Sequence, residues 1–163
     1  MSNQDTVNLI ERLVGAGVDF VVIGGVASFV HGSTYATEDL DIAARFTEEN
    51  ITQLMKALDG LSPRHALTPG KRPIVESAKD IATWKNIYVW SDAGRLDVLG
   101  ETPPVDEYEG LRGRAVEVTV GASVCCIASI EDLIAMKRAL GRPKDMLVIE
   151  QLTAIRDQRV DDI

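Results

Sequence analysis

The amino-acid sequence predicts an α/β (α+β) fold in which helices flank a mixed β-sheet. Helical and strand patterns alternate along the chain, which favours layers built around one sheet. The apolar run 20–23 has the length of a buried strand, and apolar residues recur at helical spacing over 3–16. The 163 residues suffice for one domain with its own core, and no repeat or linker divides 1–163.

The first third of the chain alternates between helices and strands. The helix over 3–16 has an apolar stripe and stops at glycines, as does a shorter apolar helix over 26–31. The run 20–23 reads as a strand buried on both faces, and in the strand 40–43 a carboxylate alternates with apolar residues. Thr47 followed by two glutamates is typical of an N-cap and first turn, so it predicts the next helix.

The rest of the chain is expected to hold two strand pairs and two helices. Two apolar runs joined by a glycine-containing turn indicate each strand pair. A capping-box-like Ser-Ile-Glu-Asp sequence starts the first helix, and Gly-Arg-Pro separates it from the second. The strand pairs are expected over 87–99 and 116–127, the helices over 129–140 and 144–156, and irregular segments over 60–75 and 100–114.

Composition and charge exclude several classes of protein. A 45% hydrophobic, 26% charged chain lies in the globular range and is not disordered. No apolar run approaches the roughly 18 residues of a membrane span, and the N-terminus lacks a signal-peptide pattern, so we expect a cytoplasmic protein with no membrane partner. The net charge of −8 disfavours a surface that follows nucleic-acid phosphates throughout, but it allows a local basic patch.

The most informative segment is Gly24-Gly25, followed after 13 residues by Asp39-Leu40-Asp41-Ile42. On a strand, Asp39 and Asp41 project from the same face, where their charges repel. A divalent cation relieves this repulsion, and magnesium prefers oxygen ligands together with water and phosphates. The glycines follow a strand and precede a helix, where backbone N–H groups can receive a phosphate. The alternative is a solvated strand end and a tight turn.

A third carboxylate lies in a later apolar strand. Asp97 stands between Leu96 and Val98, inside an element that otherwise belongs to the core. A metal ion shared with Asp39 and Asp41 would explain a carboxylate at this position.

These blocks, in this order, resemble the nucleotidyltransferase superfamily of the DNA polymerase β type. The signature of that superfamily is a hydrophobic residue with two small residues, a spacer, Asp-x-Asp or Asp-x-Glu, and a later carboxylate on a strand. Ile23-Gly24-Gly25, Asp39-Leu40-Asp41-Ile42 and Leu96-Asp97-Val98 match it. The segments 129–137 and 141–145 are further similar to small bacterial toxins of the AbiEii type, so the resemblance covers about residues 18–150.

The resemblance implies the nucleotidyltransferase fold and a reaction that needs Mg²⁺ or Mn²⁺. A nucleoside monophosphate would move from an NTP to an acceptor hydroxyl on RNA, protein or a small molecule. A role in toxin–antitoxin systems or phage defence, with a cognate antitoxin as partner, is implied as well. The implied catalytic and metal-binding residues are Asp39, Asp41 and Asp97, and the implied nucleotide-binding residues are Gly24, Gly25, Ser28 and Lys137.

One position departs from the pattern of such proteins. Tyr35 stands where many of them have an arginine, so Lys71, Arg72 or Lys137 would have to supply the missing charge near the phosphates. Without such a cation, the chain would be a catalytically inactive module that binds nucleotide or a partner protein. A phosphate-binding regulator outside this superfamily is a further alternative.

Lys137 lies on the apolar stripe of its predicted helix, with Ile130, Leu133 and Ile134. A lysine that faces inward needs a negatively charged partner, and we expect a phosphate or Asp97 in that role. The alternative is a lysine at the edge of the stripe that extends to solvent. Lys137 also belongs to two groups of basic residues that would attract an anionic substrate if they rim the site. These groups are Arg64, His65, Lys71 and Arg72, and Lys137, Arg138, Arg142 and Lys144.

Overall fold

The computed structural model describes residues 4–35, 38–105 and 107–161. Its strands are β1 (Phe20–Ile23), β2 (Leu40–Ala44), β3 (Arg64–His65), β4 (Asn86–Ser91), β5 (Gly94–Leu99), β6 (Val116–Val120) and β7 (Ser123–Ile127). Its helices are α1 (Thr6–Gly15), α2 (Gly24–His31), α3 (Glu48–Ala57), α4 (Ala78–Ile81), α5 (Tyr108–Arg114), α6 (Ile130–Leu140) and α7 (Pro143–Asp161).

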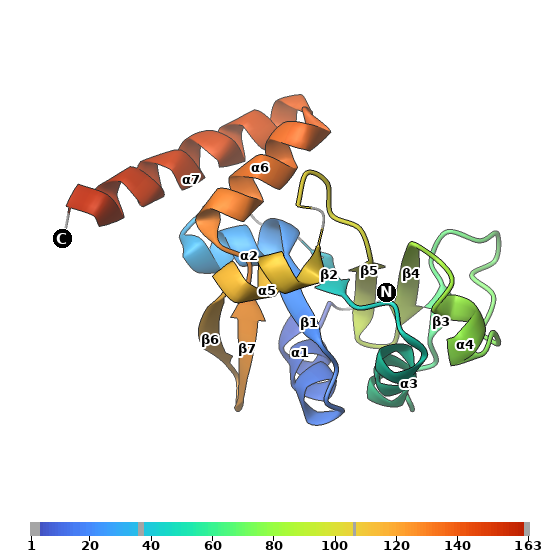
Figure 1. Ribbon diagram of the computed structural model, residues 1–163. Coiled ribbons are helices and arrows are strands. Elements are labelled where there is room, and N and C mark those ends of the chain that lie inside the picture. Colours follow the sequence, from blue (N-terminus) through green and yellow to red (C-terminus); the bar gives the residue numbers. More distant parts are fainter. Residues whose placement is uncertain (1–3, 36–37, 106, 162–163) are drawn as a thin grey trace.

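The strands form one mixed sheet in the order β3-β4-β5-β2-β1-β7-β6. Strand β2 pairs antiparallel with β1 and parallel with β5, and β1 pairs parallel with β7. Figure 1 shows α1 and α3 together on one side of the sheet and α2, α5, α6 and α7 on the other. The predicted mixed sheet flanked by helices is therefore confirmed.

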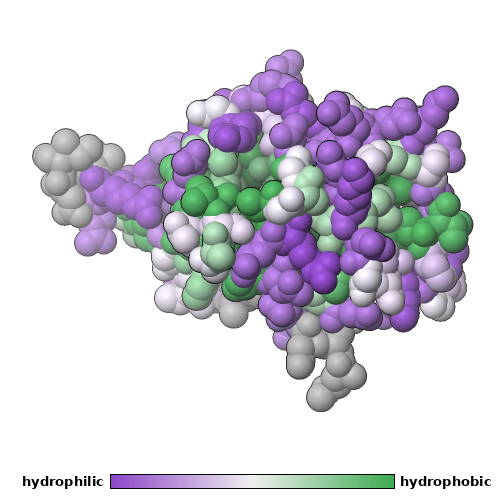
Figure 2. Space-filling model, turned by 90° about the horizontal axis from the view of Figure 1, so that it is seen from below, coloured by the Kyte–Doolittle hydropathy of each residue, from purple (hydrophilic) through white to green (hydrophobic). Residues whose placement is uncertain are grey.

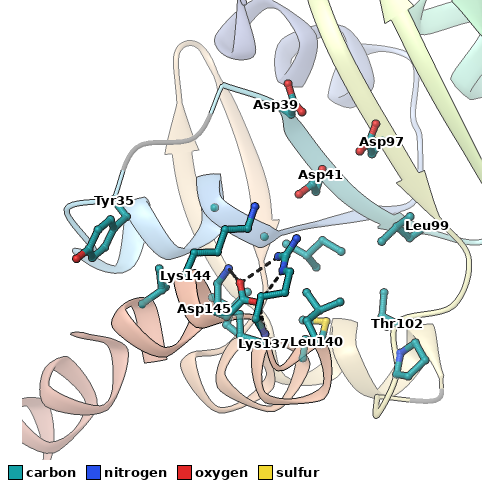
Figure 3. A pocket seen from close by; sticks show the side chains of 18 of the residues that line it. Tyr35, Asp39, Asp41, Asp97, Leu99, Thr102, Lys137, Leu140, Lys144 and Asp145 are labelled. Carbon is teal, nitrogen blue, oxygen red and sulfur yellow. Dashed lines mark hydrogen bonds and ion pairs between the residues drawn. The ribbon is translucent and has the colours of Figure 1, made fainter. Parts of the chain in front are cut away.

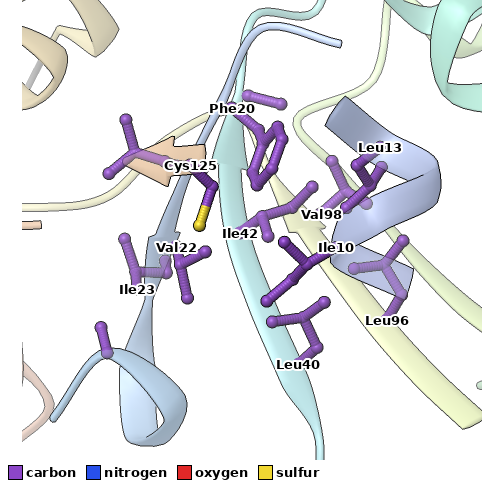
Figure 4. Packing of buried hydrophobic residues seen from close by; sticks show 14 of the residues in the cluster. Ile10, Leu13, Phe20, Val22, Ile23, Leu40, Ile42, Leu96, Val98 and Cys125 are labelled. Carbon is purple, nitrogen blue, oxygen red and sulfur yellow. The ribbon is translucent and has the colours of Figure 1, made fainter. Parts of the chain in front are cut away.

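One face of the sheet packs against α1 and forms part of the core. Leu40 and Ile42 of β2 pair in register with Leu96 and Val98 of β5, and all four side chains are fully buried. Figure 4 shows Ile10 and Leu13 of α1 close to this row. Because side chains alternate between the two faces of a strand, Asp41 and Asp97 point to the opposite face.

The predicted helix starts are confirmed by their hydrogen bonds. The Thr47 side chain accepts from the backbone N–H of Asn50, and Ser129 accepts from the N–H of Asp132. Each bond satisfies an N–H group that has no partner within its helix. At the other end, Gly32 and Gly141 adopt left-handed conformations and close α2 and α6.

Three local predictions are wrong. The segment 100–114, expected to be irregular, contains α5, because Leu111 is buried between two glycines that obscure the helical pattern. The segment 60–75 contains the short strand β3, which pairs with β4 through long-range contacts that no local pattern reveals. The last helix extends to Asp161, through a polar stretch without an apolar stripe.

The face of the molecule that carries α1 and α3 is largely polar. Figure 2 views the molecule from the side of α1 and α3 and shows hydrophilic side chains around smaller hydrophobic areas. No helix in the described part of the chain combines the length and hydropathy that a membrane span requires.

Candidate active site

A cavity of about 510 Å³ lies where α2, α6 and the start of α7 meet strands β2 and β5. Figure 3 shows Asp39, Asp41 and Asp97 on one side of it and Lys137, Lys144 and Asp145 on the other. Leu99, Leu133, Met136, Leu140 and Val148 contribute apolar wall, and Gly24 and Gly25 also line the cavity. The site thus combines an acidic side, a basic side and an apolar wall.

The acidic side depends on the register of two parallel strands. Asp41 of β2 pairs with Asp97 of β5, so their side chains leave the same face of the sheet as neighbours. Asp39 lies two residues before Asp41 and lines the same cavity. The two strands are therefore adjacent, as a metal ion shared by Asp41 and Asp97 would require.

Asp41 is the most perturbed of these carboxylates. Burial, and then the charges of Asp97 and Asp39, raise its pKa to about 7, against the opposing effect of Lys137 and Arg95. A carboxylate held in this state gains from any cation that enters beside it.

Gly24 makes room for Asp41. It is the first residue of α2 and adopts a positive φ of 66°, a conformation that favours glycine. A Cβ at this position would lie 2.4 Å from Oδ2 of Asp41. A residue with a side chain would be strained by this φ and would clash with Asp41. The glycine therefore lets the N-terminus of α2 approach the carboxylate.

Ser28 does not line the cavity, contrary to its implied role. Its side chain is 1% exposed, and its hydroxyl donates to the carbonyl of Gly24 at 3.0 Å. The short helix turns this side chain inward, where it stabilises the first turn that carries the glycines. His31, at the end of the same helix, is buried with Nε2 2.8 Å from the carbonyl of Ala128, which is a structural role.

Lys137 faces inward as predicted, but its partner is Asp145 rather than Asp97. The lysine side chain is 12% exposed, and its Nζ lies 3.8 Å from Oδ1 of Asp145. Burial lowers the pKa of Lys137, while Asp145 acts in the opposite direction. Asp145 comes from α7, so the contact depends on the packing of α6 against α7 and not on either helix alone.

Asp145 also holds Arg142. This buried carboxylate accepts from Nε of Arg142 at 2.7 Å and from its terminal nitrogen at 3.0 Å, and these bonds lower the pKa of Asp145. Arg142 and Lys137 therefore stand together at the cavity wall. The sequence analysis did not assign a role to Asp145, although a carboxylate after Gly-Arg-Pro-Lys at a helix start was a usable signal.

Tyr35 lines the cavity at the position where a cation was expected. Of the proposed substitutes, Lys137 lines the cavity, together with Arg142 and Lys144. Lys71 and Arg72 lie elsewhere: Lys71 stacks over Trp90, and Arg72 pairs with Glu76. Of the two groups of basic residues, the first does not line the cavity, and the second does so through Lys137, Arg142 and Lys144 but not Arg138.

A further cation, Arg95, which the sequence analysis missed, lies among the carboxylates. Nε of Arg95 donates to Oδ1 of Asp97 at 2.8 Å and lies 4.0 Å from Oδ2 of Asp39. The pair with Asp97 raises the pKa of Arg95. The sequence could have predicted this ion pair, because residues i and i+2 of a strand share a face and Arg95-Leu96-Asp97 has this spacing.

The three carboxylates do not form a ready three-ligand group. Among the described residues, no three His, Cys, Asp or Glu side chains lie close enough together to hold one metal ion. The expected convergence of all three is therefore wrong: Arg95 engages Asp97, and Asp39 is 45% exposed beside it. Yet magnesium needs only one or two carboxylates when phosphates and water complete its shell, so the adjacent Asp41 and Asp97 fit this ion chemically.

Comparison with known proteins finds similarity among solved structures. No family model and no curated protein matches the sequence. Among solved structures, the chain is similar to the crystal structure of ANT(2″)-Ia in complex with adenylyl-2″-tobramycin, with a TM-score of 0.53 and 16% identity. The match covers 94% of this chain and 98% of that one. At this identity the likeness concerns the fold alone, and it shows that the chain adopts a nucleotidyltransferase fold.

Proposed function

We propose that the protein is a magnesium- or manganese-dependent nucleotidyltransferase that moves a nucleoside monophosphate from an NTP to an acceptor hydroxyl. The observation that carries this proposal is the register of β2 and β5, which places Asp41 beside Asp97 in a cavity that Gly24 also lines. The shared fold with ANT(2″)-Ia supports it.

The carboxylates and the basic residues on opposite sides of the cavity would have different roles. Asp41 and Asp97, with Asp39 beside them, would hold the divalent cation. When bound, this ion neutralises negative charge on the phosphates. Lys137 and Arg142, held by Asp145, would bind phosphate oxygens from the opposite side. The apolar wall formed by Leu133, Met136 and their neighbours leaves space for the nucleoside.

The transfer itself exchanges one phosphorus–oxygen bond for another. The acceptor hydroxyl oxygen bonds to the α-phosphorus, and the bond from this phosphorus to the oxygen it shares with the β-phosphorus breaks. Pyrophosphate leaves, and the hydroxyl proton passes to Asp97. Positioning and charge stabilisation carry most of the catalysis in such phosphoryl chemistry.

A transfer assay tests this proposal. The protein is incubated with each of the four α-³²P-labelled NTPs and Mg²⁺ or Mn²⁺, in parallel with RNA, with a protein mixture and with tobramycin. Tobramycin is included because ANT(2″)-Ia was crystallised with its adenylylated form. We expect label to enter one class of acceptor, with pyrophosphate release, and none with Asp41→Asn. No incorporation into any acceptor would contradict the proposal.

The second candidate is an inactive nucleotidyltransferase fold that binds nucleotide or a partner protein. The position of Tyr35 in the cavity wall, where a cation was expected, favours it. Nucleotide binding without transfer in the assay above would support this candidate.

A link of the active enzyme to toxin–antitoxin systems or phage defence, with an antitoxin as partner, is tested by expression in bacteria. We expect growth arrest by the wild type but not by Asp41→Asn.

A further inference from the structure

The carboxylate side of the cavity already contains a cation that belongs to the protein. Strand β5 places Arg95 and Asp97 on the same face, and the guanidinium lies against the carboxylate through Nε at 2.8 Å and a terminal nitrogen at 3.4 Å. The same Nε lies 4.0 Å from Oδ2 of Asp39. The guanidinium of Arg95 thus lies within ion-pair distance of two of the three carboxylates.

Asp41 is placed differently. Among the described residues, no basic side chain lies within ion-pair distance, 4.0 Å, of its carboxylate. It lies beside Asp97 across the strand pair β2 and β5 and two residues from Asp39. Among the described residues, Asp97 and Asp39 therefore share one paired cation, and Asp41 has none within ion-pair distance.

We propose that Arg95 is the resident counter-cation of Asp97 and Asp39, and that a divalent cation entering beside Asp41 exchanges with it. This inference rests on the proposed function. The side chain of Asp97 is only 16% exposed, so its oxygens offer little room for a guanidinium and a metal ion together. Two cations on one half-enclosed carboxylate also repel each other strongly.

The ring of Tyr88 is close enough to bind the displaced guanidinium. Tyr88 pairs with Asp97 on the side away from Asp41, and the guanidinium carbon already lies 6.0 Å from the centre of its ring. A cation can rest against an aromatic face at this distance. Arg95 is also 26% exposed, so it can move without breaking the core. Arg95 is in this view a positioning residue that sets the metal affinity of the free protein.

Binding of Mn²⁺ alone, without nucleotide, tests the exchange. Mn²⁺ affinity is measured by electron paramagnetic resonance for the wild type, Arg95→Gln and the control Arg64→Gln. Arg64 is an exposed cation on the neighbouring edge of the sheet, opposite Trp90, so its removal changes net charge equally. We expect Arg95→Gln to bind Mn²⁺ about tenfold more tightly, since a competitor is gone, and Arg64→Gln to match the wild type.

A second measurement uses the wild-type protein and does not depend on a variant that folds. The Nε–H resonance of Arg95, assigned through its side chain to the backbone, is followed by NMR as Mg²⁺ is added. We expect it to shift as the bond to Asp97 is lost. An unchanged resonance at saturating Mg²⁺ would overturn the inference.

The binding data can also overturn it. Unchanged or weaker Mn²⁺ affinity in Arg95→Gln would show a structural ion pair that persists, and equal tightening in Arg64→Gln would show a general effect of charge. Absence of Mn²⁺ binding in both the wild type and Arg95→Gln would also reject the exchange. The transfer assay judges the proposed function separately, because label incorporation by the wild type does not depend on these affinities.

Discussion

Asp41 and Asp97 are direct neighbours across the parallel pair of strands β2 and β5, on the face of the sheet opposite Leu40 and Leu96. Such a pair is costly, because two carboxylates in a partly buried place repel each other. Burial, and then the charges of Asp97 and Asp39, raise the pKa of Asp41 to about 7. In the proposed function, a divalent cation bound beside the two carboxylates offsets this repulsion.

Replacing Asp41 with Asn separates the metal role from folding. The amide keeps the shape of the side chain and removes its charge, so we expect transfer activity to fall by orders of magnitude. Stability without metal should stay level or rise, because repulsion with Asp97 and Asp39 is relieved. Thermal denaturation detects this change, at about 2–4 °C per kcal/mol for a chain of this size. A variant that loses stability but keeps turnover would contradict the metal assignment.

The stability of the metal-free protein should fall as pH rises from about 4 to 7. The pKa of Asp41 is about 7 in the folded protein, against an ordinary value of 3.8. Within that window the folded protein retains a proton that the unfolded chain has lost, so the free energy of unfolding decreases with pH, by at most about 1.4 kcal/mol per unit. Denaturant unfolding at several pH values measures this slope. The difference between wild type and Asp41→Asn isolates it, and parallel curves would refute it.

Mg²⁺ should stabilise the protein more at pH 8 than at pH 5.5. The ion competes with the proton on Asp41, whose pKa of about 7 lies between these values. The shift in Tm on adding Mg²⁺ is the measurement, with Asp41→Asn as the variant in which the pH dependence disappears. A shift of equal size at both pH values would show that the ion binds elsewhere.

Gly24→Ala should cost more stability and activity than a matched change at Gly60. Both glycines have positive φ, 66° and 82°, so each alanine pays a backbone penalty of about 1–2 kcal/mol. Only at Gly24 does the new Cβ meet Asp41, at 2.4 Å, whereas no atom lies within 4 Å at Gly60. Unfolding and transfer assays of the two variants measure the difference. Equal losses would show that the contact with Asp41 has no importance.

Asp145→Asn should weaken NTP binding by loosening both cations that it holds. Arg142 and Lys137 lose a charged partner, and the cost to stability should be about 1–3 kcal/mol. Asp132→Asn is the control, since Asp132 is also a buried aspartate paired with an arginine, Arg114, and it does not line the cavity. Both variants should lose stability, but only Asp145→Asn should raise the Kd for NTP. A similar Kd in both would exclude a nucleotide role for Asp145.

The sequence alone determined the local elements and the chemical types of the candidate site. Apolar runs and a glycine-containing turn predicted the strands that carry Asp41 and Asp97, and the period of two along a strand predicted which residues share a face. N-cap residues and glycine stops predicted the helices. The same patterns could not predict α5 or β3. Leu111 and the pairing of Arg64 with Trp90 depend on partners distant in the sequence.

Only the tertiary structure decided which charges meet. Whether Asp41 lies beside Asp97 depends on the order and register of two strands more than 50 residues apart, which no local pattern specifies. The packing of α6 on α7 gave Lys137 the partner Asp145 instead of Asp97, and the turn of α2 placed Ser28 inside the protein. Side-chain type is a property of the sequence, whereas charge pairing and burial are properties of distances that arise when the elements pack.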